Sequence, residues 1–196
     1  DPGQAMPLYN GDELTPLLEQ ASYVTVNDYE SSPLQASHGL SPKAIAERAF
    51  AVSPDLGFSA ELVKEAFVIA AEAALELGDL VRLAELLAVV EALPPGGTTR
   101  FLTAHVARFR ARLAGSGEPG AAEQGFHEAA ALFREIGMPF YLAVVQLEHA
   151  ELLAANGRSD ECRPLLTEAR ESFERLRATP WLERLDALGV GVLTAA

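Results

Sequence analysis

The feature that most constrains this sequence is a set of chain breaks that recurs at nearly equal intervals. One set of breaks centres on glycines 39 and 40 residues apart, at Gly78, Gly117 and Gly157. A second set contains prolines and falls between them, at Pro94-Pro95, Pro139 and Pro180. Glycine suits the left-handed residue after a helix, and proline suits the first turn of the next. Each interval therefore predicts a pair of helices.

The segments between the breaks carry apolar residues at helical spacing. One predicted buried stripe runs through the fourth segment, with Phe126, Ala129, Phe133 and Ile136. Another runs through the first segment, with Leu62, Ala66, Ile69, Ala73 and Leu77. Neither alternates with the period of two that a strand would show. Ala and Leu dominate the composition while aromatic residues reach only 7%, which also favours helix.

We expect a mainly α protein in which short connections make neighbouring helices pack antiparallel. A single helix pair cannot bury its apolar face, so stacking of pairs is the physical reason for the repetition. Residues 59–196 should form three hairpins and a capping helix that begins at Pro180. The seven expected helices cover residues 59–77, 79–92, 98–114, 120–136, 139–155, 158–177 and 180–188.

Residues 59–196 resemble tetratricopeptide repeats. The best match is 139–180, where Leu152-Leu153, Gly157-Arg158, Ala169, Phe173 and Pro180 stand at that repeat's apolar, glycine, alanine or aromatic, and proline positions. The segments LFREIGMPF, AELLAANGR and FERLRATPWLERL are also similar to helical repeats fused to bacterial nucleotide cyclases and ATP-dependent regulators. The resemblance implies an antiparallel helical-hairpin solenoid that binds a protein, a peptide or a neighbouring domain.

The charge of the chain argues against two classes of partner. The formal net charge is −13, with seven acids and two bases in residues 1–50 and 21 acids and 13 bases in residues 51–196. A protein that binds a nucleic-acid backbone needs a basic surface, and anionic membranes also attract basic segments. We therefore expect no nucleic acid and no membrane as partner. The single cysteine, Cys162, cannot form an internal disulfide, which fits a cytoplasmic location.

The first 50 residues have a different pattern of predicted secondary structure. Tyr23-Val24-Thr25-Val26 is a short β-rich run, with expected helices around 12–20 and from Ser41. This α/β-derived segment, including Asp1-Pro2-Gly3-Gln4, resembles an internal part of ribokinase-like (PfkB-type) sugar and nucleoside kinases. Because the chain begins at Asp1 rather than Met, we expect a fragment, a processed form or a trimmed chain.

The kinase resemblance implies one candidate site. Val26-Asn27-Asp28-Tyr29-Glu30 is similar to the family's N-x-x-E motif, so Asn27 and Glu30 would organise magnesium and the phosphates of ATP. The family's GAGD motif, which supplies the catalytic aspartate and the anion hole, does not occur here. Phosphoryl transfer depends on that positioning and electrostatic stabilisation, so we expect no catalytic residues and no cofactor outside this alternative.

The helical part offers weaker candidates. The first helix of each pair should line a partner-binding groove, which makes Arg108, Gln146 and Glu148 candidate contacts. Arg108 and Arg112 share a helix face that is either solvated or binds an acidic group of a partner. The pair Glu148 and Glu151 has ordinary surface spacing. No histidine spacing indicates a metal site, and His149 falls in an apolar stripe typical of a core histidine.

Two functions remain open at this level. The first is a non-catalytic helical-repeat module for protein interaction or regulation, which could also be a regulatory segment of a larger protein. The second is a remnant of a PfkB-type kinase that retains at most magnesium-nucleotide binding. An exposed first or last helix pair could also form a homodimer, because repeat ends need capping.

Overall fold

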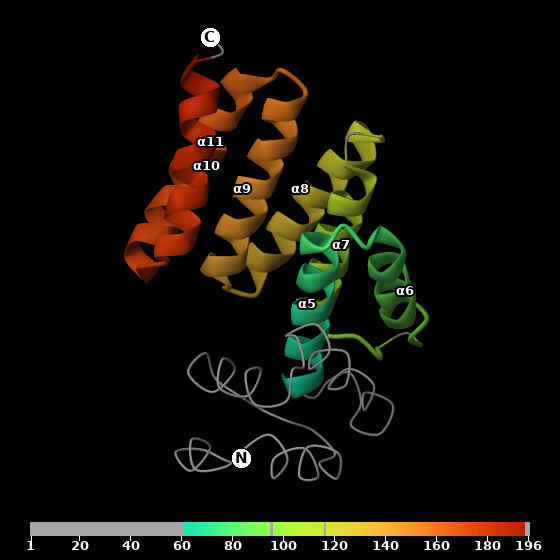
Figure 1. Cartoon of the computed structure of the whole chain (residues 1–196). Helices are drawn as coiled ribbons and strands as arrows, with labels where there is room; N and C mark the ends of the chain where they lie inside the picture. Colours follow the sequence, from blue (N-terminus) through green and yellow to red (C-terminus); the bar gives the residue numbers. More distant parts are fainter. Residues whose placement is uncertain (1–60, 95, 116, 195–196) are drawn as a thin grey trace, which may run out of the picture. The chain divides into compact units, whose positions relative to one another are not determined.

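The computed structural model describes residues 61–94, 96–115 and 117–194, all of which belong to helices or the turns between them. This part of the chain holds seven helices and no strand, which confirms the mainly α prediction (Figure 1). The predicted strand at 23–26, the candidate residues Asn27 and Glu30 and the predicted boundary between 50 and 59 lie outside the described residues. The helices are α5 (Glu61–Glu76), α6 (Leu80–Glu91), α7 (Arg100–Ala114), α8 (Pro119–Glu135), α9 (Pro139–Ala155), α10 (Ser159–Leu176) and α11 (Thr179–Thr194).

The helix boundaries follow the predicted breaks closely. Asp79 caps α6 by accepting a hydrogen bond from the Arg82 amide at 3.0 Å, and prolines open α8 and α9. The last helix runs on to Thr194, beyond the predicted end at 188. No helix among the described residues is long and apolar enough to cross a membrane.

Four helices end with the same backbone hydrogen bond, which forms beside a residue in the left-handed conformation. After α9, the Arg158 amide donates to the Leu153 carbonyl at 2.9 Å, and Gly157 takes a left-handed φ of 73°. This closure satisfies carbonyls that a helix end leaves open. The same bond follows α5, α8 and α10, where the left-handed residue is Gly78, Gly137 and Arg177.

The chain divides into two compact units, Asp1–Thr98 and Thr99–Ala196. In the first unit, α5 packs against α6, and the buried side chains of these two helices include Phe67, Leu83 and Leu87. The predicted stripe on the first helix is partly wrong, because Ile69 and Leu77 are exposed. The charged residues of this helix share one side, and Ile69 lies at the edge of that side. Leu77 lies beyond the end of the helix.

In the second unit, consecutive helices pack in chain order, and α9 also contacts α11. The connections at 136–138, 156–158 and 177–178 are short, so these neighbours run antiparallel. The predicted stripe on α8 is confirmed at Phe126, Ala129 and Phe133, which are all buried.

Helix α9 is the central helix of the second unit. Residues 143–150 are all buried, so this helix has no solvent face over two turns. On the side of α10 and α11, its core partners include Ala169, Phe173 and Leu185. A helix enclosed in this way must satisfy its polar side chains inside the protein, and α9 carries several.

Candidate functional site

A buried ion pair joins α7 to α9. The Arg108 Nε and Nη2 atoms donate to the two carboxylate oxygens of Glu148, each at 2.7 Å. Both side chains are almost completely excluded from solvent, at 0% and 1% exposure. Two parallel hydrogen bonds satisfy both carboxylate oxygens, as a buried charge requires. The two residues are 40 positions apart in the chain.

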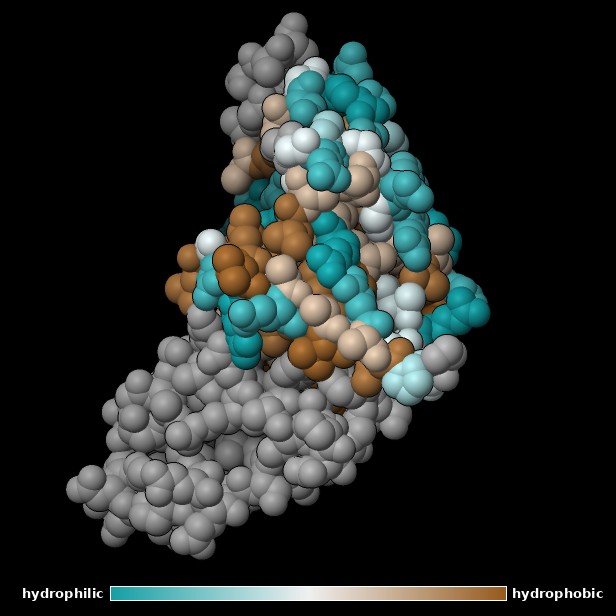
Figure 2. Space-filling model, turned by 90° about the vertical axis from the view of Figure 1, so that its right-hand side faces the viewer, coloured by the Kyte–Doolittle hydropathy of each residue, from teal (hydrophilic) through white to brown (hydrophobic). Residues whose placement is uncertain are grey.

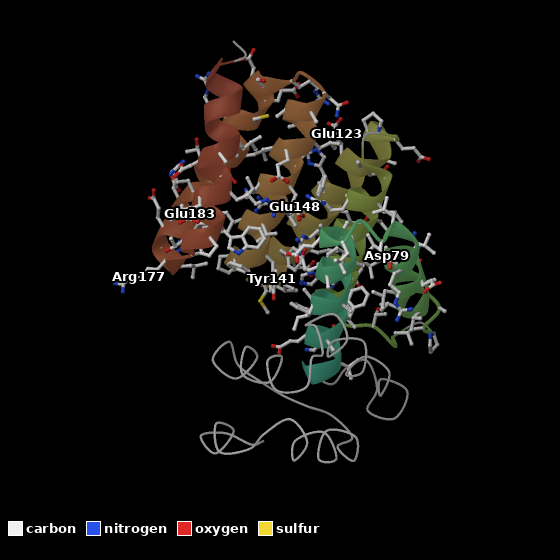
Figure 3. The ribbon with its side chains drawn as sticks, in the orientation of Figure 1. Asp79, Glu123, Tyr141, Glu148, Arg177 and Glu183 are labelled. Atoms are coloured by element: carbon white, nitrogen blue, oxygen red, sulfur yellow. The ribbon has the colours of Figure 1, made fainter. Side chains whose placement is uncertain are left out.

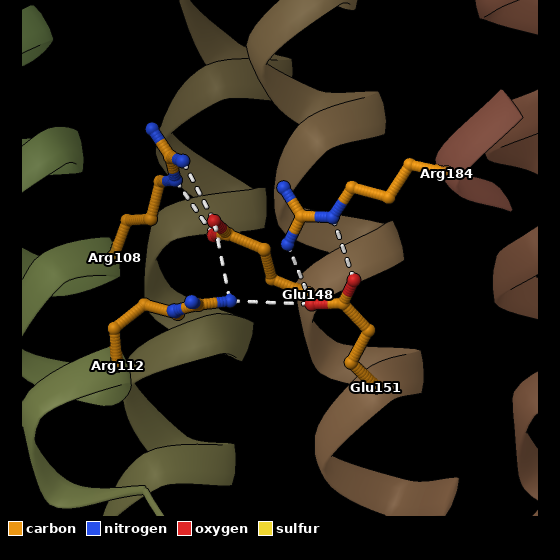
Figure 4. Close-up of polar contacts among 5 residues, drawn as sticks. All are labelled: Arg108, Arg112, Glu148, Glu151 and Arg184. Atoms are coloured by element: carbon orange, nitrogen blue, oxygen red, sulfur yellow. Dashed lines mark hydrogen bonds and ion pairs between the residues drawn. The ribbon is translucent and has the colours of Figure 1, made fainter. Parts of the chain in front are cut away.

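This pair continues into a network that reaches the surface (Figure 4). Arg112 Nη1 lies 3.6 Å from Glu148 and donates to Glu151 at 3.2 Å. Arg184 on α11 donates two hydrogen bonds to the same Glu151, at 2.7 and 2.6 Å. We call these five residues, Arg108, Arg112, Glu148, Glu151 and Arg184, the Arg–Glu network.

The network becomes more exposed along its length. The side chains of Arg112, Glu151 and Arg184 are 28–36% exposed, whereas Arg108 and Glu148 are enclosed. Figure 3 shows Glu148 in the middle of the second unit, while Arg177 and Glu183 project outward. The network therefore joins α7, α9 and α11 from the core outward.

The three arginines decide the charge state of Glu148. Burial by itself raises the pKa of this carboxyl, because a charged carboxylate is poorly solvated in the interior. The charge and hydrogen bonds of Arg108, with smaller contributions from Arg112 and Arg184, outweigh burial and hold the pKa below its usual value. Glu148 is therefore ionised at neutral pH.

The three predicted groove residues are all buried in this structure. Arg108 and Glu148 bind each other, and Gln146 donates from α9 to Glu168 on α10. The polar groups of these three residues thus form hydrogen bonds inside the protein. That these residues contact a partner stays a prediction. The expected surface position of Glu148 is wrong, because α7 supplies the arginines that allow this carboxylate to be buried.

The sequence analysis did not predict the ion pairs between these residues, although it identified the interval at which they occur. Arg108 and Arg112 share a face and were expected to be solvated or to bind an acidic group. The acidic groups are Glu148 and Glu151 of the same chain, 40 and 39 positions further on. That separation equals the interval between the glycine breaks, so matching charges at the repeat interval could have found the network.

A second polar residue, His105, lies inside an aromatic cluster. Its ring centroid is 4.6 Å from those of Phe101 and Tyr141 and 4.9 Å from that of Phe133. Neither ring nitrogen has a hydrogen-bond partner among the described residues. Burial, with the nearby positive charge of Arg108, lowers the pKa of His105 well below its usual range. The ring is therefore neutral and packs as an aromatic residue.

A third buried polar residue is His149. Its exposure is 6%, as expected for a core histidine. Its ring stacks on Phe126, and its Nε2 lies 4.0 Å from the Glu123 carboxylate. Burial lowers the pKa of His149, with a smaller contribution from His127. Among the described residues, no group of three or more His, Cys, Asp or Glu side chains could hold a metal ion.

The thiol of Cys162 is buried between α9 and α10. Its sulfur donates to the Ala150 carbonyl at 3.2 Å. Burial, with the charge of Glu161, raises the pKa of the thiol. Nucleophilic chemistry requires the thiolate, so this cysteine acts as a packed core residue.

Comparisons with protein-family models, curated proteins and solved structures found no match to this chain.

Proposed function

We propose that residues 59–196 form a non-catalytic, tetratricopeptide-like solenoid that binds a protein or peptide, or a neighbouring domain of a larger chain. The observation that carries this proposal is the Arg108–Glu148 pair, whose members are 40 positions apart. A contact between residues one repeat apart is what stacking of successive helix pairs produces. Arg112 and Glu151, 39 positions apart, repeat that relation.

The order of helix packing supports the same arrangement. Helices α7 and α9 are the first helices of two successive pairs, and α11 occupies the next equivalent position. The Arg–Glu network connects these three helices, and α9 also packs against α11. A layer of first helices beside a layer of second helices is the arrangement by which helical repeats build an extended binding surface.

The placement of polar residues supports binding rather than catalysis. In the second unit the buried side chains of Arg108 and Glu148 bind each other, and the buried His105 ring packs against Phe133. Large apolar side chains are nevertheless exposed, among them Ile69, Val81 and Val89 in the first unit. Exposed apolar groups that gather on one surface mark interaction sites. The lone buried thiol of Cys162 supports a cytoplasmic setting for this role.

A peptide-display selection against the intact chain tests the proposal. We expect selected peptides to bind in calorimetry, and to compete with one another where they share a surface. A matched selection against an unrelated acidic helical protein removes peptides that respond to charge alone. A selection that yields no specific peptide, together with a monomer in sedimentation, would contradict an interaction module.

The alternative function rests on the resemblance of Asn27 and Glu30 to a kinase motif. Under this proposal the chain binds ATP with magnesium without transferring phosphate. Calorimetric titration should then show magnesium-dependent heat that Glu30→Ala removes. Absence of heat, or heat unchanged in the Glu30→Ala variant, would exclude this alternative and leave the interaction module standing.

A further inference from the structure

Helix α6 carries apolar residues on two opposite faces. One face, with Leu83, Leu86, Leu87 and Val90, is buried. At 100° per residue the opposite face carries six positions, of which only one is charged. We call these six, Val81, Ala84, Glu85, Ala88, Val89 and Ala92, the outer face of α6.

The outer face of α6 is open to solvent. Val81 is 73% exposed and Val89 is 44% exposed. Two more large apolar side chains are exposed nearby in the chain, Leu77 at 65% before the helix and Leu80 at 47% at its first position. Figure 2 shows that exposed hydrophobic side chains, in brown, lie beside polar ones, in teal, on the face that it draws. A helix of this length has no need of a second apolar face for its own packing.

The charges around this face are predominantly negative. Residues 61–94 contain seven acids and two bases, a net charge of −5. Glu85 is exposed on the outer face, where Arg82 binds it at 2.9 Å, and Glu91 is exposed at the end of the same helix. The surface thus combines an apolar stripe with an acidic surround.

We propose that the outer face of α6 binds an amphipathic, basic helix of a partner protein, a proposal that rests on the interaction function above. An apolar stripe on the partner covers Val81 and Val89, and the small side chains of Ala84 and Ala88 let its backbone approach closely. Lysines or arginines flanking the partner's stripe face the glutamates.

Charge favours this occupant over a second copy of the chain and over an anionic membrane. A second copy of the chain would bring the same acidic surround and a further net charge of −13, so symmetric pairing sets acid against acid. An anionic membrane surface would be repelled for the same reason. A basic helix gains from both the stripe and its surround.

The test uses a fluorescent model peptide with a leucine stripe flanked by lysines, titrated into the intact chain at low and moderate salt. Two control peptides share its length: one has glutamate in place of lysine, and the other has the same composition in an order that breaks the stripe. We expect saturable binding of the model peptide, weakened by salt, and binding at least about tenfold weaker for each control.

Protein variants locate the site. The double variant Val81→Ser/Val89→Ser changes two exposed side chains, so the fold should persist by circular dichroism while affinity falls about tenfold or more. The matched control Met138→Ser/Leu176→Ser changes two exposed apolar side chains of the second unit and should leave the affinity within about twofold. Glu85→Lys should weaken binding and reduce its salt dependence.

Three results would overturn the assignment: equal binding of the broken-stripe peptide, no effect of the Val81→Ser/Val89→Ser variant, or a dimer in sedimentation that this variant dissociates. If peptides from the display selection still bind the Val81→Ser/Val89→Ser variant, the interaction function survives and only the α6 site fails. If no peptide binds the unmodified chain in either experiment, both proposals fail.

Discussion

The effect of Glu148 on the stability of this fold depends on whether its partner Arg108 is present. Glu148 lies in the stretch 143–150, where every residue is buried, and Arg108 from another helix supplies both of its short hydrogen bonds. Removing one partner of a buried pair leaves an uncompensated charge, whereas replacing both by apolar groups of similar volume is often neutral. The stability of this site therefore depends on the pair rather than on either residue.

We predict that Glu148→Gln lowers the free energy of unfolding by about 3–5 kcal/mol in denaturant titration, because Arg108 stays buried without the charge of Glu148. The control Glu135→Gln breaks the exposed pair with Arg100 and should cost under about 1 kcal/mol. The double variant Arg108→Met/Glu148→Leu should recover most of the loss. Equal effects of Glu148→Gln and Glu135→Gln would contradict the role of burial.

His105 predicts a pH dependence of stability. Its folded pKa lies well below 6.5, so between that pKa and 6.5 the unfolded chain binds a proton that the folded chain does not. The contribution of His105 to stability therefore falls as the pH drops below about 6.5, by about 1.4 kcal/mol per pH unit until the folded pKa is reached, and is constant above 6.5. Between pH 7.5 and 5.5, His105→Phe should reduce the loss of stability by about 1 kcal/mol.

The control for this measurement is Tyr141→Phe, which changes the same aromatic cluster without removing a group that titrates in this range. It should shift the stability by the same amount at both pH values. A wild-type chain equally stable at pH 7.5 and 5.5 would show that the imidazole is not held neutral. His149, whose pKa is also lowered, should account for part of the remaining slope.

At the scale of elements, the approach of α8 to α7 depends on a glycine within the helix. A methyl group added at Gly125 would lie 3.0 Å from the Ala111 Cβ and 3.1 Å from the Ala107 carbonyl oxygen. Gly120, in the same helix, has nothing within 4 Å of that position. A side chain is therefore sterically excluded at Gly125, inside the helix, but not at Gly120, in its first turn.

We predict that Gly125→Ala destabilises the chain by about 1 kcal/mol, because the overpacking cost exceeds the gain in helix propensity. Gly120→Ala should instead stabilise it, by up to about 1 kcal/mol. Thermal unfolding of the two variants measures both effects. Stabilisation by both substitutions would mean that α7 and α8 can separate at little cost.

At the scale of the whole molecule, the two compact units should be distinguishable in unfolding experiments. The chain has one tryptophan, Trp181, which packs against Phe140 and Phe173 in the second unit. Its fluorescence therefore reports on the second unit, whereas far-ultraviolet circular dichroism reports on all helices. Different probes give coincident curves only when a protein unfolds as one cooperative unit.

We predict that the two curves differ in urea, with helix loss beginning before the tryptophan signal changes. Helices α5 and α6 of the first unit expose Ile69, Val81 and Val89, and apolar surface left in water adds no stability to a folded unit. Buffer containing the stripe peptide that binds α6 should bring the two transitions closer together. Superimposable curves without the peptide would show that the units unfold together.

The sequence by itself determined the helical class and the positions of the breaks. Local chemistry is sufficient for these features, because glycine, proline and capping residues act on the backbone beside them, as Gly157 and Asp79 do. Period alone also identified the buried stripe of α8, where polar residues cover the opposite face. On the first helix the period was only partly right, because Ile69 lies at the edge of the charged side and Leu77 lies beyond the end of the helix.

Only the tertiary structure decided which charges are buried. Glu148 and Glu151 have the spacing of a solvated helix face, and nothing near them in the chain indicates otherwise. Their partners come from α7 and α11, so burial depends on which helices lie side by side. The sequence shows a period of about 40 residues, but only the packed fold shows that contacts one repeat apart carry the buried charge, because a charge can leave water only where another element supplies its counter-charge.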